Sequence, residues 1–292
     1  MQFKGNSDQS NARYWDDLAA LYQKETRIST DDFHYGPLLP GDSILGLLPK
    51  EFCRPGDPTR RFQCLELGCG AGQNSIFLAK QGAQCTAIDI SEEQLKHGRR
   101  LAAKENTAVD FRRVSMDSPL ADLKILPQQS NTPTIQHSIL PSFDLIHSTY
   151  ALPFSADPQK VIAEAAAMLK PGGTFLLTTG HPLYAGEWLD VGDGEDGVFI
   201  PDYFHPEPDV RMSLDDKTMS AARYWPISQI AEWIHAAGLV IERLLEPAPM
   251  PIPDMSEAEI RATVPYESRD WRGLYPQLAH IPVVVIFKCR RV

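Results

Sequence analysis

The sequence predicts an α/β fold in which helices cover both faces of a doubly wound, mainly parallel sheet. Segments typical of strands alternate with segments typical of helices between residues 62 and 179, an order that favours a parallel sheet. The first strand runs into a glycine-rich turn, and the second ends on Asp89. Both features are typical of the ligand crevice at the carboxyl ends of parallel strands.

The elements follow one another in a regular order. A helix is predicted over residues 10–24, where Tyr14, Trp15 and Tyr22 recur at helical spacing, and an aromatic loop follows at 30–39. After a Pro- and Gly-rich hinge at 54–59, strands are expected at 62–67, 84–90, 109–115, 143–147 and 174–179. Helices are expected at 74–81, 91–105 and 156–169, the second of them capped by Ser91.

The remaining segments are less regular. Residues 120–142 are polar and proline-rich, which predicts a surface loop, and Lys170-Pro171-Gly172-Gly173 is expected to end the helix 156–169 before the fifth strand at 174–179. Residues 181–222 show no periodicity. A helix at 227–237 and strands at 239–245 and 281–289 follow, with the proline-rich segment 247–280 between the two strands.

No linker divides two cores, so we expect a single domain. Its parts are an N-terminal cap (1–58), a cofactor-binding core (59–180), a lid insertion (181–225) and the C-terminal part of the sheet (226–292).

Composition excludes several classes of function. The 292 residues carry 28 basic and 38 acidic side chains, a net charge of −10, which is a poor match for a nucleic-acid backbone. Residues 1–11 lack the apolar stretch of a signal peptide, and the longest apolar run, 283–287, is too short to cross a bilayer. Five cysteines without a CxxC pair fit a reducing cytoplasm. We expect neither nucleic acid nor membrane as partner, and a homodimer stays open.

The glycine-rich turn carries the chemistry. Leu65-Glu66-Leu67-Gly68-Cys69-Gly70-Ala71-Gly72 lets a ligand approach the backbone closely, and a carboxylate at Asp89 can accept both ribose hydroxyl hydrogens. A dinucleotide site prefers G-x-G-x-x-G, whose third glycine would fall at Gln73. The pattern here is G-x-G-x-G with Glu66 two residues ahead, and a carboxylate there suits an ammonium group better than a pyrophosphate. The spacing favours S-adenosylmethionine over NAD.

These motifs resemble the class I S-adenosylmethionine-dependent methyltransferases, particularly the small-molecule branch that includes the ubiquinone-biosynthesis type. Residues 65–72 are similar to the first motif of the family, 87–91 to its ribose-binding strand end and 114–118 to its adenine-proximal segment. Residues 143–148 and 168–174 match its fourth strand and the turn into its fifth. The resemblance implies a Rossmann-like methyltransferase fold of about seven strands, one of them antiparallel near the edge, with an N-terminal helical cap and a lid insertion.

The resemblance also implies roles for individual residues. Gly68, Gly70 and Gly72 would admit the methionine portion of the cofactor, and Glu66 would support its ammonium group. Asp89 would hold the ribose and Asp117 the adenine. Further cofactor contacts are expected from Tyr22, Cys69, Asn74, Ile90, Gln94, Met116, Ser118 and Ser148.

The acceptor side is predicted from positions near strand ends. His181, just after the fifth strand, and His147, ending the fourth, are the candidate catalytic bases, although either could instead bond loop backbone or pack beside the cofactor. The candidate acceptor contacts are His34, Tyr35, Tyr150, Phe154 and Tyr184. The acidic segment 190–197 lacks the carboxylate spacing of a calcium loop, so no metal is expected.

The predicted function is transfer of a methyl group from S-adenosylmethionine to a small-molecule acceptor, aromatic or apolar in character, by in-line displacement. A non-catalytic S-adenosylmethionine-binding protein is one alternative. A nucleic-acid methyltransferase is another, but Ser148-Thr149-Tyr150-Ala151 stands where base methylators often carry Asn/Asp-Pro-Pro-aromatic. A nicotinamide-dependent dehydrogenase is disfavoured by the glycine spacing.

Overall fold

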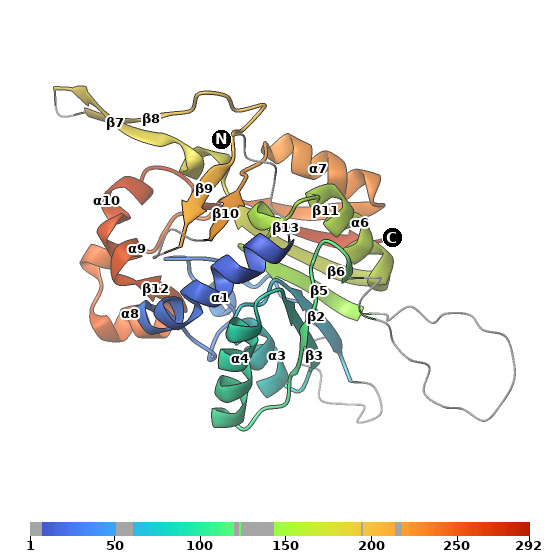
Figure 1. Cartoon of the computed structure of the whole chain (residues 1–292). Helices are drawn as coiled ribbons and strands as arrows, with labels where there is room; N and C mark the ends of the chain where they lie inside the picture. Colours follow the sequence, from blue (N-terminus) through green and yellow to red (C-terminus); the bar gives the residue numbers. More distant parts are fainter. Residues whose placement is uncertain (1–7, 51–60, 120–122, 124–142, 194, 214–217) are drawn as a thin grey trace, which may run out of the picture.

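A seven-stranded sheet runs through the middle of the molecule in the order β11-β13-β6-β5-β2-β3-β4 (Figure 1). The computed structural model describes residues 8–50, 61–119, 123, 143–193, 195–213 and 218–292. The strands are β2 (Gln63–Leu67), β3 (Gln84–Asp89), β4 (Asp110–Arg113), β5 (Phe143–Thr149), β6 (Leu169–Gly180), β11 (Leu239–Leu245) and β13 (Val284–Arg291). Strands β4, β3, β2, β5 and β6 pair in parallel, whereas β13 is antiparallel to both β6 and β11. The predicted fold class is confirmed.

Four helices alternate with these strands, as the sequence predicts. They are α3 (Gln73–Lys80), α4 (Glu92–Lys104), α6 (Pro158–Met168) and α7 (Ile227–Ala236). Helix α4 begins where predicted, because the Ser91 side chain accepts a hydrogen bond from the backbone N–H of Gln94. Asp157 caps α6 in the same way, with Pro158 in the first turn.

Alternation along the strands gives the sheet two buried faces. Leu65 and Leu67 on β2 point into a core with the buried residues of α6 and α7. Cys64 points to the other face, into a second core with Phe33 and Tyr35 of the N-terminal segment. Glu66 lies on this second face, between two covered layers, and is buried.

The C-terminal segment predicted as merely proline-rich contains several short elements that cover the second face. They are η4 (Ile252–Asp254), α8 (Glu257–Thr263), β12 (Tyr266–Ser268), α9 (Arg269–Gly273) and α10 (Tyr275–Leu278). Strand β12 pairs antiparallel with β1 (Thr26–Ile28), which ties this segment to the N-terminal part of the chain. The short helix α2 (Asp42–Leu45) lies in the N-terminal segment.

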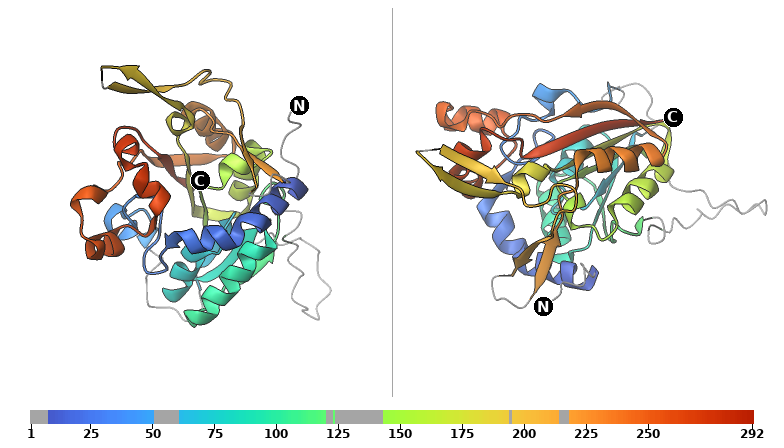
Figure 2. Two further views of the ribbon diagram at one scale, coloured as in Figure 1. Left: turned by 60° about the vertical axis from the view of Figure 1, so that its left-hand side comes forward. Right: turned by 90° about the horizontal axis from the view of Figure 1, so that it is seen from above.

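The lid insertion forms two hairpins instead of an irregular loop. After η3 (Pro182–Ala185), β7 (Glu187–Gly192) pairs with β8 (Glu195–Phe199), and β9 (Asp209–Met212) pairs with β10 (Met219–Ala222). The first hairpin projects from the body as an arm (Figures 1 and 2). The N-terminal helix α1 (Asp8–Glu25) packs against α4 and against β10.

Two further expectations differ from the structure or lie outside it. Helix α6 ends at Met168, just before the predicted break, but strand β6 starts at Leu169 instead of residue 174, and Gly172, with a φ of 77°, lies within this strand. Cys53, the hinge 54–59 and the loop 120–142, apart from Leu123, lie outside the described residues. Within the described residues, no helix is long and apolar enough to cross a membrane.

Candidate functional site

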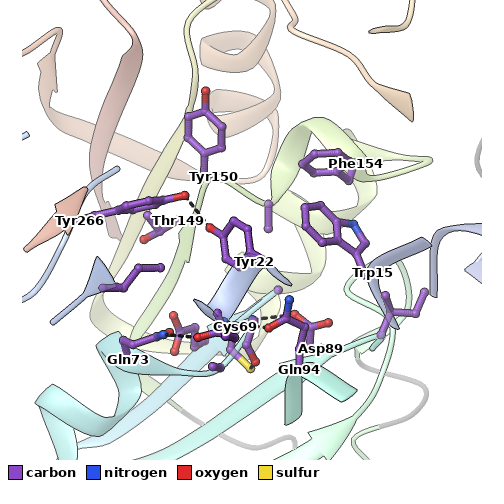
Figure 3. A pocket seen from close by; sticks show the side chains of 18 of the residues that line it. Trp15, Tyr22, Cys69, Gln73, Asp89, Gln94, Thr149, Tyr150, Phe154 and Tyr266 are labelled. Carbon is purple, nitrogen blue, oxygen red and sulfur yellow. Dashed lines mark hydrogen bonds between the residues drawn. The ribbon is translucent and has the colours of Figure 1, made fainter. Parts of the chain in front are cut away.

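A cavity opens at the carboxyl ends of β2, β3 and β5, beneath helix α1 (Figure 3). Cys69, Asp89 and Gln94 lie along one side of it, and Tyr150 and Phe154 along the opposite side. The predicted site residues in its wall are Tyr22, His34, Glu66, Gly68, Cys69, Gly70, Asp89, Ile90, Gln94, Met116, Tyr150 and Phe154. The fold therefore brings cofactor and acceptor candidates together in one continuous cavity.

The glycine-rich turn forms the floor of the cavity. Gly70 has a φ of 55°, and a Cβ atom there would meet nothing closer than Gln94 Oε1 at 3.9 Å, so its missing side chain leaves open space in the wall. Gly72 is different, because a Cβ atom there would lie 2.6 Å from the Phe111 ring. The missing side chain of Gly70 thus leaves space for a ligand, whereas that of Gly72 leaves space for the Phe111 ring.

Asp89 connects this turn to the start of α4. Its Oδ2 accepts a hydrogen bond from Gly70 N at 2.7 Å, and its Oδ1 accepts one from Ser91 N at 2.9 Å. Burial raises the pKa of Asp89 to about 6, against the opposing effect of these backbone N–H groups. Each carboxylate oxygen has further acceptor capacity beyond its one backbone bond, as two ligand hydroxyl groups require.

Glu66 is a buried carboxyl group at the same end of the cavity. Its Oε2 accepts hydrogen bonds from Ser75 N at 3.1 Å and Ser75 Oγ at 2.5 Å. Its Oε1 lies 3.9 Å from His147 Nδ1, beyond hydrogen-bond distance. Burial raises the pKa of Glu66 to about 8. A carboxyl group in this setting is well placed to pair with a ligand cation.

Helix α1 is fastened over this floor by polar contacts. Gln23 Nε2 donates to Gln94 Oε1 at 2.9 Å, and Gln73 Nε2 donates to Gln23 Oε1 at 3.1 Å (Figure 3). Asp16 Oδ1 accepts hydrogen bonds from Ser91 Oγ at 2.6 Å and Glu93 N at 3.1 Å. The helix therefore closes the cavity above the glycine-rich turn and the start of α4.

Aromatic side chains build the other half of the cavity. The rings of Trp15 and Phe154 meet edge to face at 5.0 Å between centroids, and the Tyr22 and Tyr266 hydroxyls share a hydrogen bond of 2.5 Å. Trp271 lies 6.4 Å from Tyr150, centroid to centroid. These rings come from three separate parts of the chain, and they make a compartment suited to a flat, apolar molecule.

Tyr150 is held in an unusual backbone conformation. It follows β5 directly and has a φ of 62°, in the left-handed region that bulky residues avoid. Its backbone N–H donates to Thr178 O at 2.8 Å, which fixes the turn. Such strain persists where the surroundings enforce it, commonly at binding sites.

His34 is the histidine in the cavity wall. Asn74 holds its backbone on both sides: His34 N donates to Asn74 Oδ1 at 2.9 Å, and Asn74 Nδ2 donates to His34 O at 3.0 Å. Its Nδ1 is buried without a hydrogen-bond partner among the described residues. Burial lowers the pKa of His34 to about 3, so the imidazole is neutral and a weak base in the free protein.

The two predicted catalytic histidines lie outside the wall. His181 Nδ1 accepts a hydrogen bond from Leu183 N at 3.1 Å, so its Nε2 carries the proton and donates to Glu246 Oε1 at 2.9 Å. His147 is fully buried behind Glu66, and burial lowers its pKa to about 3. In this geometry, His181 stabilises a loop and His147 packs behind the site; their catalytic roles stay predictions.

Several other predicted contacts also lie outside the wall. Asp117 caps the chain before α6, accepting hydrogen bonds from Ser155 Oγ, from Ala156 N at 3.1 Å and from Asp157 N at 3.3 Å. Ser148 Oγ donates to Leu67 O at 3.0 Å. The full set comprises Tyr35, Gly72, Asn74, Asp117, Ser118, Ser148 and Tyr184. Most of these bond or pack against protein groups that sequence alone does not reveal.

The wall also contains residues that sequence reasoning missed. Ala71, Gln73, Thr149 and Ala151 adjoin predicted positions, so their place in the motif could have identified them. Arg211, Tyr266 and Trp271 come from the lid insertion and the proline-rich segment, where no periodicity or motif marks them. The remaining members are Asn11, Trp15, Gln23 and Ile28.

Comparisons with known proteins agree with this geometry. Residues 65–177 match a family model described as a methyltransferase domain. A ubiquinone biosynthesis O-methyltransferase from Xanthomonas campestris pv. campestris (strain B100) is 33% identical over 115 residues, which cover 39% of this chain and 41% of that relative. The chain therefore matches about two fifths of the length of that relative.

Solved structures share the fold over most of the chain. An S-adenosylmethionine-dependent methyltransferase from Mesorhizobium loti has a TM-score of 0.56 at 23% identity, covering 85% of this chain and 96% of its own. The [4+2]-cyclase SpnF has a TM-score of 0.55 at 17% identity, covering 98% and 97%. At these identities the likeness concerns the fold, which serves a methyltransferase and a cyclase alike.

Proposed function

We propose that this chain, a class I S-adenosylmethionine-dependent methyltransferase by its domain match and its fold, transfers a methyl group from S-adenosylmethionine to a small-molecule acceptor. The observation that carries the proposal is the wall shared by Glu66, Gly70 and Asp89, which continues without a break into an aromatic compartment. One cavity thus offers a place for a charged nucleoside and a place for its reaction partner.

The residues present fit the cofactor. Asp89 has acceptor capacity for the two ribose hydroxyls, and the open space at Gly70 admits the chain that joins the ribose to the methionine ammonium. Glu66 offers that ammonium a buried carboxylate, since no cationic side chain among the described residues bonds to it. Met116 and Ile90 provide apolar wall for the adenine.

When bound, the cofactor supplies a methyl group already activated by its positive sulfur. The protein therefore has to align an acceptor and keep water out, which the aromatic compartment and α1 are suited to do. If the acceptor is a hydroxyl or amine, its proton has to leave as the new bond to carbon forms. We place that proton on His34, because its imidazole lies in the wall; since burial keeps its pKa low in the free protein, this role requires that the bound ligands raise that pKa.

The acceptor class and the location belong to the same proposal. The compartment is enclosed by side chains from α1, β5, the lid and the C-terminal segment, which favours a small molecule over a polymer. The four cysteines among the described residues are buried and unpaired, which favours the reducing cytoplasm.

Calorimetric titration with S-adenosylmethionine, S-adenosylhomocysteine and NAD tests the cofactor. We expect micromolar binding of the first two and none of NAD. Asp89→Asn should weaken binding about 10- to 100-fold, since it weakens charged hydrogen bonds to the ribose. The control is Asp144→Asn, which loses an ion pair with Lys170 near the opposite end of β5. Equal effects of the two substitutions would contradict the site.

Turnover is the second test, because a cyclase has the same fold and the fold therefore does not establish methyl transfer. We expect purified protein with S-adenosylmethionine and a panel of small aromatic hydroxy compounds to release S-adenosylhomocysteine in step with a methylated product. Tight cofactor binding with no product from any acceptor class would instead favour a protein that binds the cofactor without transferring its methyl group.

A further inference from the structure

A single arginine reaches the aromatic half of the cavity from the lid. Arg211, on β9, is the one Lys or Arg among the described residues that line the cavity, and its side chain is only 33% exposed. Its guanidinium carbon lies 5.5 Å from the centroid of the Phe154 ring. The acidic residues of the wall, Glu66 and Asp89, belong to the cofactor side. The two halves of the cavity therefore differ in the sign of their charge.

Part of the guanidinium is free for a ligand. Arg211 Nε donates to Asp209 Oδ2 at 2.9 Å, and Nη2 lies 2.8 Å from the same oxygen and 2.8 Å from the Tyr224 hydroxyl, to which it donates. Within the described residues, Nη1 makes no hydrogen bond, although it carries two N–H groups. The Asp209 side chain is 46% exposed, so a ligand group can displace it from the arginine while its carboxylate turns to solvent.

From this arrangement we propose that the acceptor is an aromatic acid, whose carboxylate binds Arg211 while its ring lies among Trp15, Phe154 and Trp271. The inference rests on the proposed function and specifies its substrate class. A half-buried arginine favours a planar anion, because the guanidinium fork matches carboxylate geometry with two parallel hydrogen bonds. Flat rings on the remaining walls favour an aromatic body for the same molecule.

The test compares matched acids and amides. Benzoate and benzamide form one pair, and salicylate and salicylamide form another; within a pair only the charged group changes. Binding is measured by calorimetry or ligand-observed NMR with S-adenosylhomocysteine present, which occupies the cofactor side. We expect each acid to bind at least about ten times more tightly than its amide. Equal binding within both pairs, or no binding of any of the four at millimolar concentration, overturns the inference.

Two substitutions move the preference in opposite directions. Arg211→Met should remove the preference for acids, whereas Asp209→Asn should increase it, because the competing carboxylate loses its charge. Arg211→Lys keeps the charge without the fork and should retain part of the preference. The inference is overturned if the preference for acids survives in Arg211→Met. It is also overturned if that preference is unchanged or lower in Asp209→Asn, because the Arg211–Asp209 ion pair is then only structural.

The readouts separate this inference from the proposed function. Failure of S-adenosylhomocysteine to bind contradicts the proposed function, and the acid and amide pairs are then measured on the protein alone. If the cofactor binds normally but acids and amides bind with equal affinity, only the inference of an aromatic-acid acceptor is rejected, and the proposed function stands. Thermal unfolding of each variant, compared with the unsubstituted protein, identifies any substitution that prevents folding. If a variant does not fold, the inference is judged from the acid–amide comparison on the unsubstituted protein.

Discussion

The buried carboxyl of Glu66 sets the charge of the cofactor side near neutral pH. Its pKa of about 8 means that the group is largely protonated at pH 7 in the free protein. A ligand ammonium beside it favours the ionised form and lowers that pKa. Binding of the ligand and loss of the proton are therefore linked.

Binding of S-adenosylhomocysteine at pH 7 should release about one proton from Glu66. The release should fade above pH 8, where the free carboxyl is already ionised, so affinity should rise with pH up to that point and then level off. Calorimetry in buffers of different ionisation enthalpy measures the proton count. Glu66→Gln should abolish the release, and a release that persists in this variant would assign the proton to another group.

His34 is the residue whose position favours proton transfer. His34→Gln should lower kcat about 100-fold or more while leaving the affinity for S-adenosylhomocysteine within a few-fold, since the ring packs edge to face against Tyr266 of the aromatic half, 5.3 Å between centroids. Steady-state kinetics on any identified acceptor, with the exposed His280→Gln as control, measures the effect. A comparable loss of kcat in His181→Gln, with His34→Gln still active, would instead identify His181 as the base, as the sequence predicts.

At the scale of elements, close packing of α4 keeps the glycine-rich turn in place. A Cβ atom on Gly98 of α4 would lie 2.7 Å from the Phe111 ring and 2.9 Å from the backbone oxygen of Ala71. Phe111 also occupies the space left by Gly72. One ring on β4 therefore sets how closely the helix and the turn approach each other.

Gly98→Ala should destabilise the fold by about 1–3 kcal/mol, although alanine favours helix, because the contact overpacks the Phe111 ring. Gly273→Ala is the matched control, since a Cβ atom at that end of α9 would meet nothing within 4 Å. Urea unfolding of both variants measures the difference. A neutral Gly98→Ala would mean that α4 can shift away from the turn without loss.

Sequence was sufficient where local chemistry decides the structure. The order of strands and helices, the cap at Ser91 and the glycine-rich turn follow from periodicity, side-chain capping and backbone freedom. The pairing of Gly70 with Asp89 also follows, because two neighbouring parallel strands end at the same edge of the sheet.

Sequence was insufficient where distant segments meet. Arg211 and Trp271 enter the wall from segments without periodicity, and only tertiary contacts place them there. Asp117 illustrates the converse: its position matches a motif, yet backbone N–H groups at residues 156 and 157 draw its carboxylate away from the cavity. Hydrogen-bond partners far along the chain are not visible in a local pattern.

At the scale of the whole molecule, the arm β7–β8 stands apart from the site. Its two strands pair with each other and not with the central sheet (Figure 2). Leu189 and Phe199 on this arm are exposed. The lid's second hairpin, by contrast, supplies Arg211 to the cavity. The insertion thus divides into a part that borders the site and a part that does not.

Replacing residues 189–197 with an Asn-Gly turn should leave cofactor affinity unchanged and shift Tm by less than about 3 °C. The replacement joins Trp188 to Val198, which already face each other across the hairpin. Calorimetric titration and thermal unfolding measure both quantities. A large loss of affinity would show that the arm contributes to the cavity after all.

The placement of β13 between β6 and β11 also determines when the edge of β6 becomes paired during synthesis of the chain. A ribosome that has produced the chain as far as β11 has released β6, but the strand that pairs with the free edge of β6 is still to be translated. Until residues 284–291 emerge, that edge is open to pairing with other nascent chains. Slow translation just before this point therefore prolongs the time for which the edge of β6 is open to such pairing.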